Sequence, residues 1–271
     1  MTHLTVDIGN SDLKLGWFQG SRLLSTHRIT GWQQLLPKLP TKFVEECKPP
    51  VEAENYDLIL CSVVPPHVDD VVQAIEQVYG KAHQITIVSP QTPLPKELLI
   101  HWGEYPLDQL GADRWVNVVA AYATCNHRPV AVIDFGTATT LNVLGEGNTY
   151  LGGMILPGLE TFAGILGKKT ALLPDLTFQR PDEVLGTSTI SCMSSGIYYG
   201  YTGLIKEVMA QMRQQFEPKP LYIVATGGMA QVFQDELPSE VNIFDEIDPE
   251  WTLKGLSVLY HHFVGQNVAS L

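Results

Sequence analysis

Two short copies of one pattern hold the residues of this chain that are best suited to chemistry. In residues 5–11 (TVDIGNS) and 132–138 (VIDFGTA), an apolar strand runs into Asp-x-Gly and then a small polar side chain. Because glycine has no Cβ, Gly9 and Gly136 would let backbone N–H groups approach a phosphate closely. The pattern therefore predicts a phosphate-binding turn after each of the two strands.

The carboxylates of Asp7 and Asp134 add hard oxygen ligands to these two turns. Mg²⁺ that is bound with a nucleoside triphosphate keeps most of its waters and needs only one or two protein carboxylates. A single Asp-x-Gly is more often an ordinary tight turn. Two copies instead indicate two related lobes that face each other across a cleft, with one phosphate turn from each lobe.

Composition narrows the class of protein. The 271 residues are 45% hydrophobic, which is ample for a core, and the net charge of −12 without a run of Lys or Arg argues against nucleic-acid and membrane partners. We expect no targeting or membrane segment, because no stretch of about 18 apolar residues occurs. The four cysteines form no Cys-x-x-Cys pair, so we expect reduced, mostly buried thiols. These features favour a cytoplasmic enzyme with a small-molecule substrate.

Apolar patterning predicts a similar order of elements in both halves of the chain. An antiparallel three-strand meander opens the first half, a β-α-β unit follows, and the proline-rich segment 89–110 is expected to connect the halves over the cleft. The second half repeats the meander and adds a long helix, whose apolar stripe fits the core or a dimer interface. Predicted strands are 4–7, 13–18, 22–29, 57–63, 84–88, 130–134, 139–144, 150–158 and 221–225; predicted helices are 67–79, 111–123, 189–216 and 253–263.

Five motifs together resemble those of the type III pantothenate kinase family, which lies within the actin-like ATPase and sugar kinase superfamily. Each motif alone is a weak signal, whereas the whole set in the family's order and spacing argues against chance. The resemblance covers residues 5 to about 228. The motifs are DIGNS at 7–11 with Lys14, GADR at 111–114, DFGTAT at 134–139, GGMILPG at 152–158, and Thr189 ahead of Ser195-Gly196.

The resemblance implies an α/β fold of duplicated actin-like (ribonuclease H-like) domains, with mixed sheets flanked by helices and an ATP cleft between them. We expect one lobe at residues 1–110 and the other at 111–271. The implied activity is ATP- and Mg²⁺-dependent phosphorylation of the primary hydroxyl of pantothenate to 4'-phosphopantothenate, the first step of coenzyme A biosynthesis. The implied assembly is a homodimer in which the partner subunit completes the pantothenate site.

The same resemblance assigns Asp113 as the catalytic base. In the first turn of a helix, the macrodipole favours a carboxylate that can accept a hydrogen bond from the pantothenate hydroxyl. A loose transition state for phosphoryl transfer requires little proton abstraction until late, so low basicity is no obstacle. Helix capping or dipole pairing is the alternative role for Asp113.

The pantothenate site implied by the resemblance also contains Tyr105, Gly111, Ala112, Arg114 and Thr189. Arg114 could offer a planar fork to the substrate carboxylate or to the transferring phosphoryl group, or it could form a surface ion pair. Thr189 matches a residue that reaches pantothenate from the other subunit, although threonine is also a common N-cap. The family has Tyr-x-x-Pro before this helix, whereas here proline follows Tyr105 at once, so the contact of Tyr105 with substrate stays open.

Phosphate and cation roles are likewise implied by the resemblance. Asp134 is assigned first to a monovalent cation, K⁺ or NH₄⁺, and second to Mg²⁺ through water, while Asp7 would hold Mg²⁺ through water. Lys14 would place a point charge near the β and γ phosphates if it faces inward, or would simply lie in solvent. Residues 226–228 (TGG) match an adenosine-side turn or form a plain strand-to-helix turn. The other phosphate ligands are Gly9, Asn10, Ser11, Gly136 and Thr137.

Two alternative functions stay open on sequence alone. Another small-molecule kinase or a phosphatase of the superfamily is one, although such proteins are usually longer and lack Gly-x-Asp-Arg at this spacing. A non-catalytic accessory or regulatory protein on the same fold is the other. The acidic composition and the intact set of Asp7, Asp113 and Asp134 weigh against a regulator that binds DNA.

Overall fold

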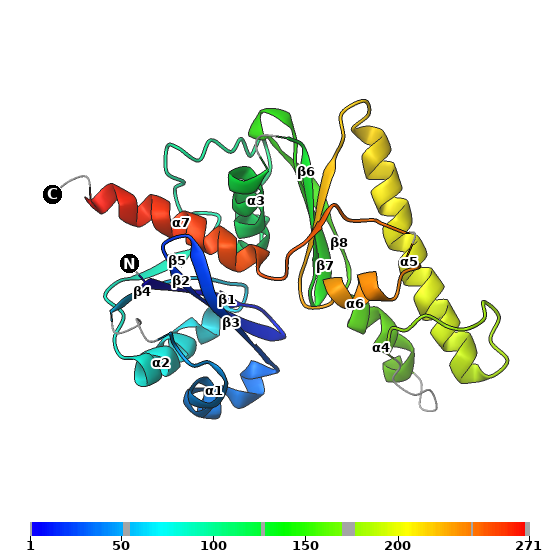
Figure 1. The fold of residues 1–271 in the computed structure, drawn as a ribbon, viewed down its shortest axis with the longest axis horizontal. Coiled ribbons are helices and arrows are strands. Elements are labelled where there is room, and N and C mark those ends of the chain that lie inside the picture. Colours follow the sequence, from blue (N-terminus) through cyan, green and yellow to red (C-terminus); the bar gives the residue numbers. More distant parts are fainter. Residues whose placement is uncertain (1, 51–54, 126–127, 170–176, 240, 269–271) are drawn as a thin grey trace. The chain divides into compact units, whose positions relative to one another are not determined.

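The computed structural model describes residues 2–50, 55–125, 128–169, 177–239 and 241–268. These residues form two compact units, each built on a five-stranded sheet (Figure 1). Each unit is assembled from separate stretches of chain. The first unit comprises Met1–Asn126, Gly147–Tyr150 and Glu250–Leu271, and the second comprises His127–Glu146 and Leu151–Pro249.

The sheet of the first unit has the strand order β3-β2-β1-β4-β5. The central strand β1 pairs antiparallel with β2 and parallel with β4, so the sheet is mixed. The predicted meander and the predicted β-α-β unit are both confirmed. The strands are β1 (Thr2–Ile8), β2 (Asp12–Gln19), β3 (Arg22–Thr30), β4 (Tyr56–Ser62) and β5 (Ile85–Val88).

Helices cover both faces of this first sheet (Figure 1). Side chains of α1 and α2 share one buried cluster with Leu4, Val6 and Ile8 of β1. The intervening residues of β1 face α7, as the 2.9 Å hydrogen bond between His3 Nε2 and Ser257 Oγ demonstrates, and α3 packs against α7 and β4. The helical segments are η1 (Trp32–Lys38), α1 (Leu39–Glu46), η2 (Pro65–His67), α2 (Val68–Tyr79), η3 (Leu107–Gln109), α3 (Ala112–Thr124) and α7 (Trp251–Val268).

The sheet of the second unit repeats the arrangement, with the order β8-β7-β6-β9-β10. Here β6 takes the place of β1, because it pairs antiparallel with β7 and parallel with β9. The two mixed sheets with matching strand orders confirm the predicted duplicated α/β fold. The strands are β6 (Val130–Phe135), β7 (Ala138–Leu144), β8 (Tyr150–Pro157), β9 (Tyr222–Thr226) and β10 (Glu246–Ile247).

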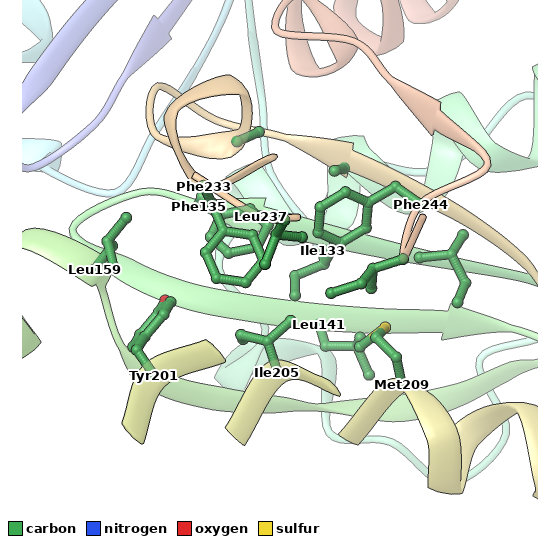
Figure 2. Close-up of a cluster of buried hydrophobic side chains, with 14 of the residues drawn as sticks. Ile133, Phe135, Leu141, Leu159, Tyr201, Ile205, Met209, Phe233, Leu237 and Phe244 are labelled. Atoms are coloured by element: carbon green, nitrogen blue, oxygen red, sulfur yellow. The ribbon is translucent and has the colours of Figure 1, made fainter. Parts of the chain in front are cut away.

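The longest helix of the second unit, α5, packs one apolar face on this sheet. Tyr201, Ile205 and Met209 lie against the sheet residues Ile133 and Leu141 in one buried cluster (Figure 2). The apolar stripe of α5 is therefore part of the core, which is one of its two predicted roles. The other helical segments of the second half are η4 (Glu146–Asn148), α4 (Leu159–Lys169) and α6 (Ala230–Asp235), and α5 is Thr189–Gln215.

The two units do not follow the predicted lobes, which were divided once, between residues 110 and 111. Helix α3, which was placed in the second lobe, packs against α7 and β4 of the first sheet, and α7 returns to β1 and β2. Both helices contribute apolar side chains that the first sheet needs on its second face, among them Trp115 and Leu256, which are almost fully buried. Among the described residues, no helix is long and apolar enough to cross a membrane.

Candidate active site

Asp7 stands at the end of β1 with a partner on each side. Its Cα pairs with Lys14 on β2 and with Cys61 on β4. Residues directly opposite each other on neighbouring strands present their side chains on the same face. Asp7 is only 8% exposed and Lys14 is half-buried. The side chains of Lys14 and Asp7 therefore lie on the same face of the sheet, next to each other.

Cys61 connects Asp7 with Asp113. The Cys61 thiol lies 3.6 Å from Asp7 Oδ1 as a hydrogen-bond donor, and its side chain is fully buried. Burial first, and then the nearby carboxylates of Asp7 and Asp113, raise the pKa of the Cys61 thiol well above its usual value. Asp7 and Asp113 both belong to the first unit, in which α3 packs against β4, the strand that pairs with β1.

The first predicted phosphate turn is held by backbone and indole hydrogen bonds. Gly9 N–H donates to the Asp12 carbonyl at 2.9 Å, and the Trp32 indole N–H donates to the Gly9 carbonyl at 2.9 Å. A Cβ on Gly9 would lie 3.0 Å from the Asp12 carbonyl oxygen, so this turn favours glycine. Asn10 at its tip is exposed, and Ser11 is half-buried. Both polar side chains are therefore accessible to a ligand.

The start of α3 fixes the carboxylate of Asp113. Gly111 has extended backbone angles and stands as the N-cap residue, and Asp113 Oδ1 accepts a 2.7 Å hydrogen bond from the Arg114 N–H. A Cβ on Gly111 would lie 2.6 Å from the same oxygen. Gly111 thus leaves the space that the half-buried carboxylate occupies. The bond to a helix N-terminal N–H stabilises the anionic form of Asp113.

Arg114 points into the protein and not along the surface. Its side chain is buried, at 7% exposure, so the surface ion pair that the sequence left open is wrong. Arg114 Nη2 donates to the Tyr150 hydroxyl at 3.1 Å. The ring of Tyr105 meets the ring of Tyr150 edge-on at 5.1 Å between centroids. The structure thereby links Arg114 with Tyr105 through a tyrosine that the sequence analysis did not single out.

Asp134 in the second unit has a matching place at the end of β6. Its Cα pairs with Thr140 on β7 and with Thr226 on β9. Gly227 follows with a positive φ of 90°, and a Cβ there would lie 2.4 Å from Asp134 Oδ1. The TGG turn therefore closes directly on the half-buried Asp134 carboxylate. This close approach requires glycine at position 227, in addition to the conformation that only glycine readily adopts.

The GGMILPG motif ends in a glycine that supports the second phosphate turn. Gly158 N–H donates to the Thr137 carbonyl at 3.2 Å, and the Thr161 hydroxyl donates to the same carbonyl at 3.1 Å. A Cβ on Gly158 would lie 2.3 Å from the Gly136 carbonyl oxygen. The turn and the start of α4 are therefore packed backbone to backbone, which leaves the exposed Thr137 side chain at the rim.

Thr189 is the first residue of α5 but not its cap. Ser188 is the N-cap, and its side chain and that of Ser191 form a reciprocal capping box. The predicted alternative role of Thr189 as N-cap is therefore wrong, and its exposed side chain is not used in capping. It lines a cavity of about 930 Å³ together with Phe162, Gly186, Thr187, Ser188, Cys192, Met193, Gly196 and Ile197.

Comparison with known sequences decides the family. The sequence profile described as type III pantothenate kinase matches residues 3–211. The chain belongs to the type III pantothenate kinase family. A type III pantothenate kinase from Dehalococcoides mccartyi is 33% identical over 268 residues, covering 95% of this chain and 96% of the relative. One from Moorella thermoacetica is 33% identical over 265 residues, covering 95% and 98%.

A solved structure supports the fold of this type III pantothenate kinase family member. A Campylobacter jejuni protein named after the Baf family of transcriptional activators matches with a TM-score of 0.58 and 19% identity, over 97% of this chain and 99% of the other. At this level of identity the similarity shows a shared fold and nothing about activity. It therefore supports the architecture of two mixed sheets described above.

The donor set fits the magnesium nucleotide that a pantothenate kinase uses. Among the described residues, no cluster of three or more His, Cys, Asp or Glu side chains could hold a metal ion by itself. Mg²⁺ bound with ATP takes oxygen ligands from phosphates and water and needs one or two carboxylates. Asp7, which stands at the end of β1 next to the Gly9 turn, is a carboxylate of the kind that such a nucleotide can use.

Proposed function

We propose that this chain transfers the γ-phosphoryl group of ATP to the primary hydroxyl of pantothenate, giving 4'-phosphopantothenate in the first step of coenzyme A biosynthesis. Family membership supports the substrate and the reaction. The observation that supports the mechanism is the carboxylate of Asp113, which accepts the Arg114 N–H at the start of α3, a helix that packs against β4 beside the strand of Asp7. The proposed base and the proposed cation-binding carboxylate therefore belong to the same unit.

In this proposal Asp113 accepts the hydrogen bond of the pantothenate hydroxyl and orients it. Phosphoryl transfer depends mainly on positioning and on neutralising charge, so a carboxylate suffices as the base. The positive end of the α3 dipole favours a carboxylate that accepts hydrogen bonds at this position. As the hydroxyl oxygen bonds to the γ-phosphorus and the bond from that phosphorus to the leaving ADP breaks, the hydroxyl proton passes to an Asp113 oxygen. Gly111 and Ala112 belong to the same turn and would contact the substrate through their backbone.

The two glycine turns would bind the phosphates of ATP. On the first turn, Asn10 and Ser11 would donate to phosphate oxygens, Gly9 would allow the close approach while its own N–H stays bound to the Asp12 carbonyl, and Lys14 would add positive charge. On the second turn, the backbone of Gly136 and the hydroxyl of Thr137 donate in the same way. When bound, Mg²⁺ neutralises phosphate charge, and we propose that Asp7 holds it through water.

We further propose a monovalent cation, K⁺ or NH₄⁺, at Asp134. Thr226 is fully buried, and its hydroxyl has no hydrogen-bond partner among the described residues. Its Cα pairs with that of Asp134, so this oxygen and the carboxylate share one face of the sheet. Oxygen ligands of this kind suit hard cations.

The test is ADP release by purified protein with ATP, Mg²⁺ and pantothenate, in K⁺ or with Na⁺ in its place. We expect turnover that requires pantothenate and is high in K⁺ and low in Na⁺. In the Asp134→Asn variant, most of the difference in turnover between K⁺ and Na⁺ should disappear. Turnover with another hydroxyl compound but not with pantothenate would contradict the substrate, and no turnover with any acceptor would favour a regulatory protein.

We also propose a homodimer in which Thr189 reaches the partner's pantothenate site. Strand β8 lies at one edge of its sheet and exposes Leu151 at 55% and Ile155 at 65%, and Ile190 beside Thr189 is 54% exposed. Apolar edges of this kind are usually covered. Sedimentation should give twice the 30.0 kDa of one chain, and Ile155→Glu should shift the mass towards the monomer. An active monomer would refute the role of Thr189.

A further inference from the structure

Tyr150 is a buried residue that links two members of the proposed pantothenate site. Its hydroxyl accepts the 3.1 Å hydrogen bond from Arg114 Nη2, and its ring contacts that of Tyr105. The ring of Trp102 packs on it from another direction, with centroids 5.3 Å apart. Tyr150 is 4% exposed and Arg114 is 7% exposed. The hydrogen bond between them is therefore shielded from water, where such bonds contribute most to orientation.

Backbone contacts hold Tyr150 in place independently of Arg114. Tyr150 N–H donates to the His101 carbonyl at 2.8 Å, and His101 N–H donates to the Asn148 carbonyl at 2.9 Å. His101 and Thr149 form a parallel bridge within this pairing. Tyr150, which belongs to the first unit, is thereby fastened to the segment that precedes α3. Because these backbone bonds hold Tyr150 without help from Arg114, its hydroxyl offers the guanidinium an acceptor at a fixed place.

We propose that Tyr150 is a positioning residue that orients the Arg114 guanidinium towards the carboxylate of bound pantothenate. The inference rests on the proposed function. A guanidinium is planar with five N–H donors, so a bond from Nη2 to Tyr150 restricts the directions in which its other four N–H groups can point. The aromatic rings of Trp102 and Tyr105, which pack on Tyr150, suit the organic part of pantothenate better than a triphosphate. The sequence left two anions open as partners of Arg114, the substrate carboxylate and the transferring phosphoryl group. This setting favours the carboxylate.

The chemistry of a tyrosine fits this role. Burial, and to a lesser degree the neighbouring Tyr105, raises the pKa of Tyr150 to about 12, although Arg114 opposes the shift. The hydroxyl therefore stays neutral at physiological pH. A neutral acceptor orients the guanidinium without cancelling its positive charge, whereas a carboxylate in the same place would compete with the substrate.

Tyr150→Phe tests the proposal, because it keeps the ring and removes only the hydroxyl. We expect KM for pantothenate to rise about tenfold, the effect of losing one hydrogen bond to a charged group, with kcat within about threefold and KM for ATP unchanged. The matched control is Tyr122→Phe. Tyr122 lies on α3, as Arg114 does, and its hydroxyl donates to the Glu97 carbonyl at 3.0 Å. Tyr122→Phe should leave kcat and the KM for pantothenate unchanged.

An analogue of pantothenate with CH₂OH in place of the carboxylate distinguishes a specific effect on the orientation of Arg114 from a general disturbance of the substrate site. In Tyr150→Phe, the preference in kcat/KM for pantothenate over this alcohol should fall about tenfold. An equal loss for both substrates, an unchanged KM, or a lower kcat at constant KM would overturn the proposal. If the wild-type protein fails to phosphorylate pantothenate, the proposed function is wrong. Calorimetric binding of pantothenate to both proteins then decides, and equal or absent binding overturns the role of Tyr150.

Discussion

Asp113→Asn is expected to lower kcat by about 10²–10⁴-fold, which is the usual contribution of a positioned general base. The amide keeps nearly the same size and can still accept the hydrogen bond from the Arg114 N–H. It cannot take the proton of the pantothenate hydroxyl. KM for ATP should change little, because Asp113 does not belong to either glycine turn. Steady-state kinetics with both substrates varied measures these effects.

The matched control for this variant is Asp69→Asn. Asp69 is an exposed carboxylate in the first turn of α2, so its loss removes a similar interaction with a helix dipole. We expect normal turnover and a stability loss of about 0.3–1 kcal/mol. The melting temperatures of the two variants should therefore be similar. Near-normal kcat in Asp113→Asn would show that another group, or no group, accepts the proton.

Gly158→Ala is expected to damage the second phosphate turn. The new Cβ would lie 2.3 Å from the Gly136 carbonyl oxygen and 2.4 Å from that of Thr137, and both obstacles are backbone atoms. The turn must move, so we expect a loss of about 1–3 kcal/mol in the free energy of unfolding, as for overpacking. KM for ATP should rise about tenfold or more, which corresponds to about 1.4 kcal/mol.

Gly203→Ala separates this steric effect from the ordinary effect of replacing glycine. Gly203 lies inside α5, and a Cβ there would meet no atom within 4 Å. We expect this control to gain about 0.5–1 kcal/mol in stability and to keep its KM for ATP. Urea unfolding and ATP kinetics on both variants provide the comparison. If Gly158→Ala bound ATP normally, the second turn would not bind phosphate in the proposed way.

Segments with a clear apolar pattern were predictable from the sequence, whereas helices α1 and α4 were not predicted. The strands of both meanders and the helices α2, α3, α5 and α7 follow the apolar pattern closely. Helix α1 escaped prediction because its eight residues follow a 3₁₀ turn and include a proline in the first turn, so no period is established. The cap of α5 could not be chosen by pattern either. Residues 187–189 are Thr-Ser-Thr, and all three can cap a helix.

In the candidate site, residues within local motifs were predictable, whereas residues placed by contacts with distant parts of the chain were not. Asp7, Asp113 and Asp134 stand at strand or helix ends, where local sequence already points to ligand chemistry. Tyr150 was read only as part of a strand, because its partner Arg114 is 36 residues away and meets it through tertiary contacts. Cys61 was expected to be a buried thiol, which is correct, but its place beside Asp7 depends on strand register. Register between distant strands is set by packing of the whole unit.

The burial of the cysteines has a practical consequence for labelling the protein. Cys47, Cys61 and Cys125 are buried, and burial raises the pKa of Cys47 to about 12, whereas Cys192 is exposed. Only thiolates react readily with maleimides and similar reagents. Under native conditions the wild-type chain thus behaves as a single-cysteine protein. A fluorophore placed on Cys192 would sit one turn from Thr189, on the cavity wall at the start of α5, without any engineered substitution.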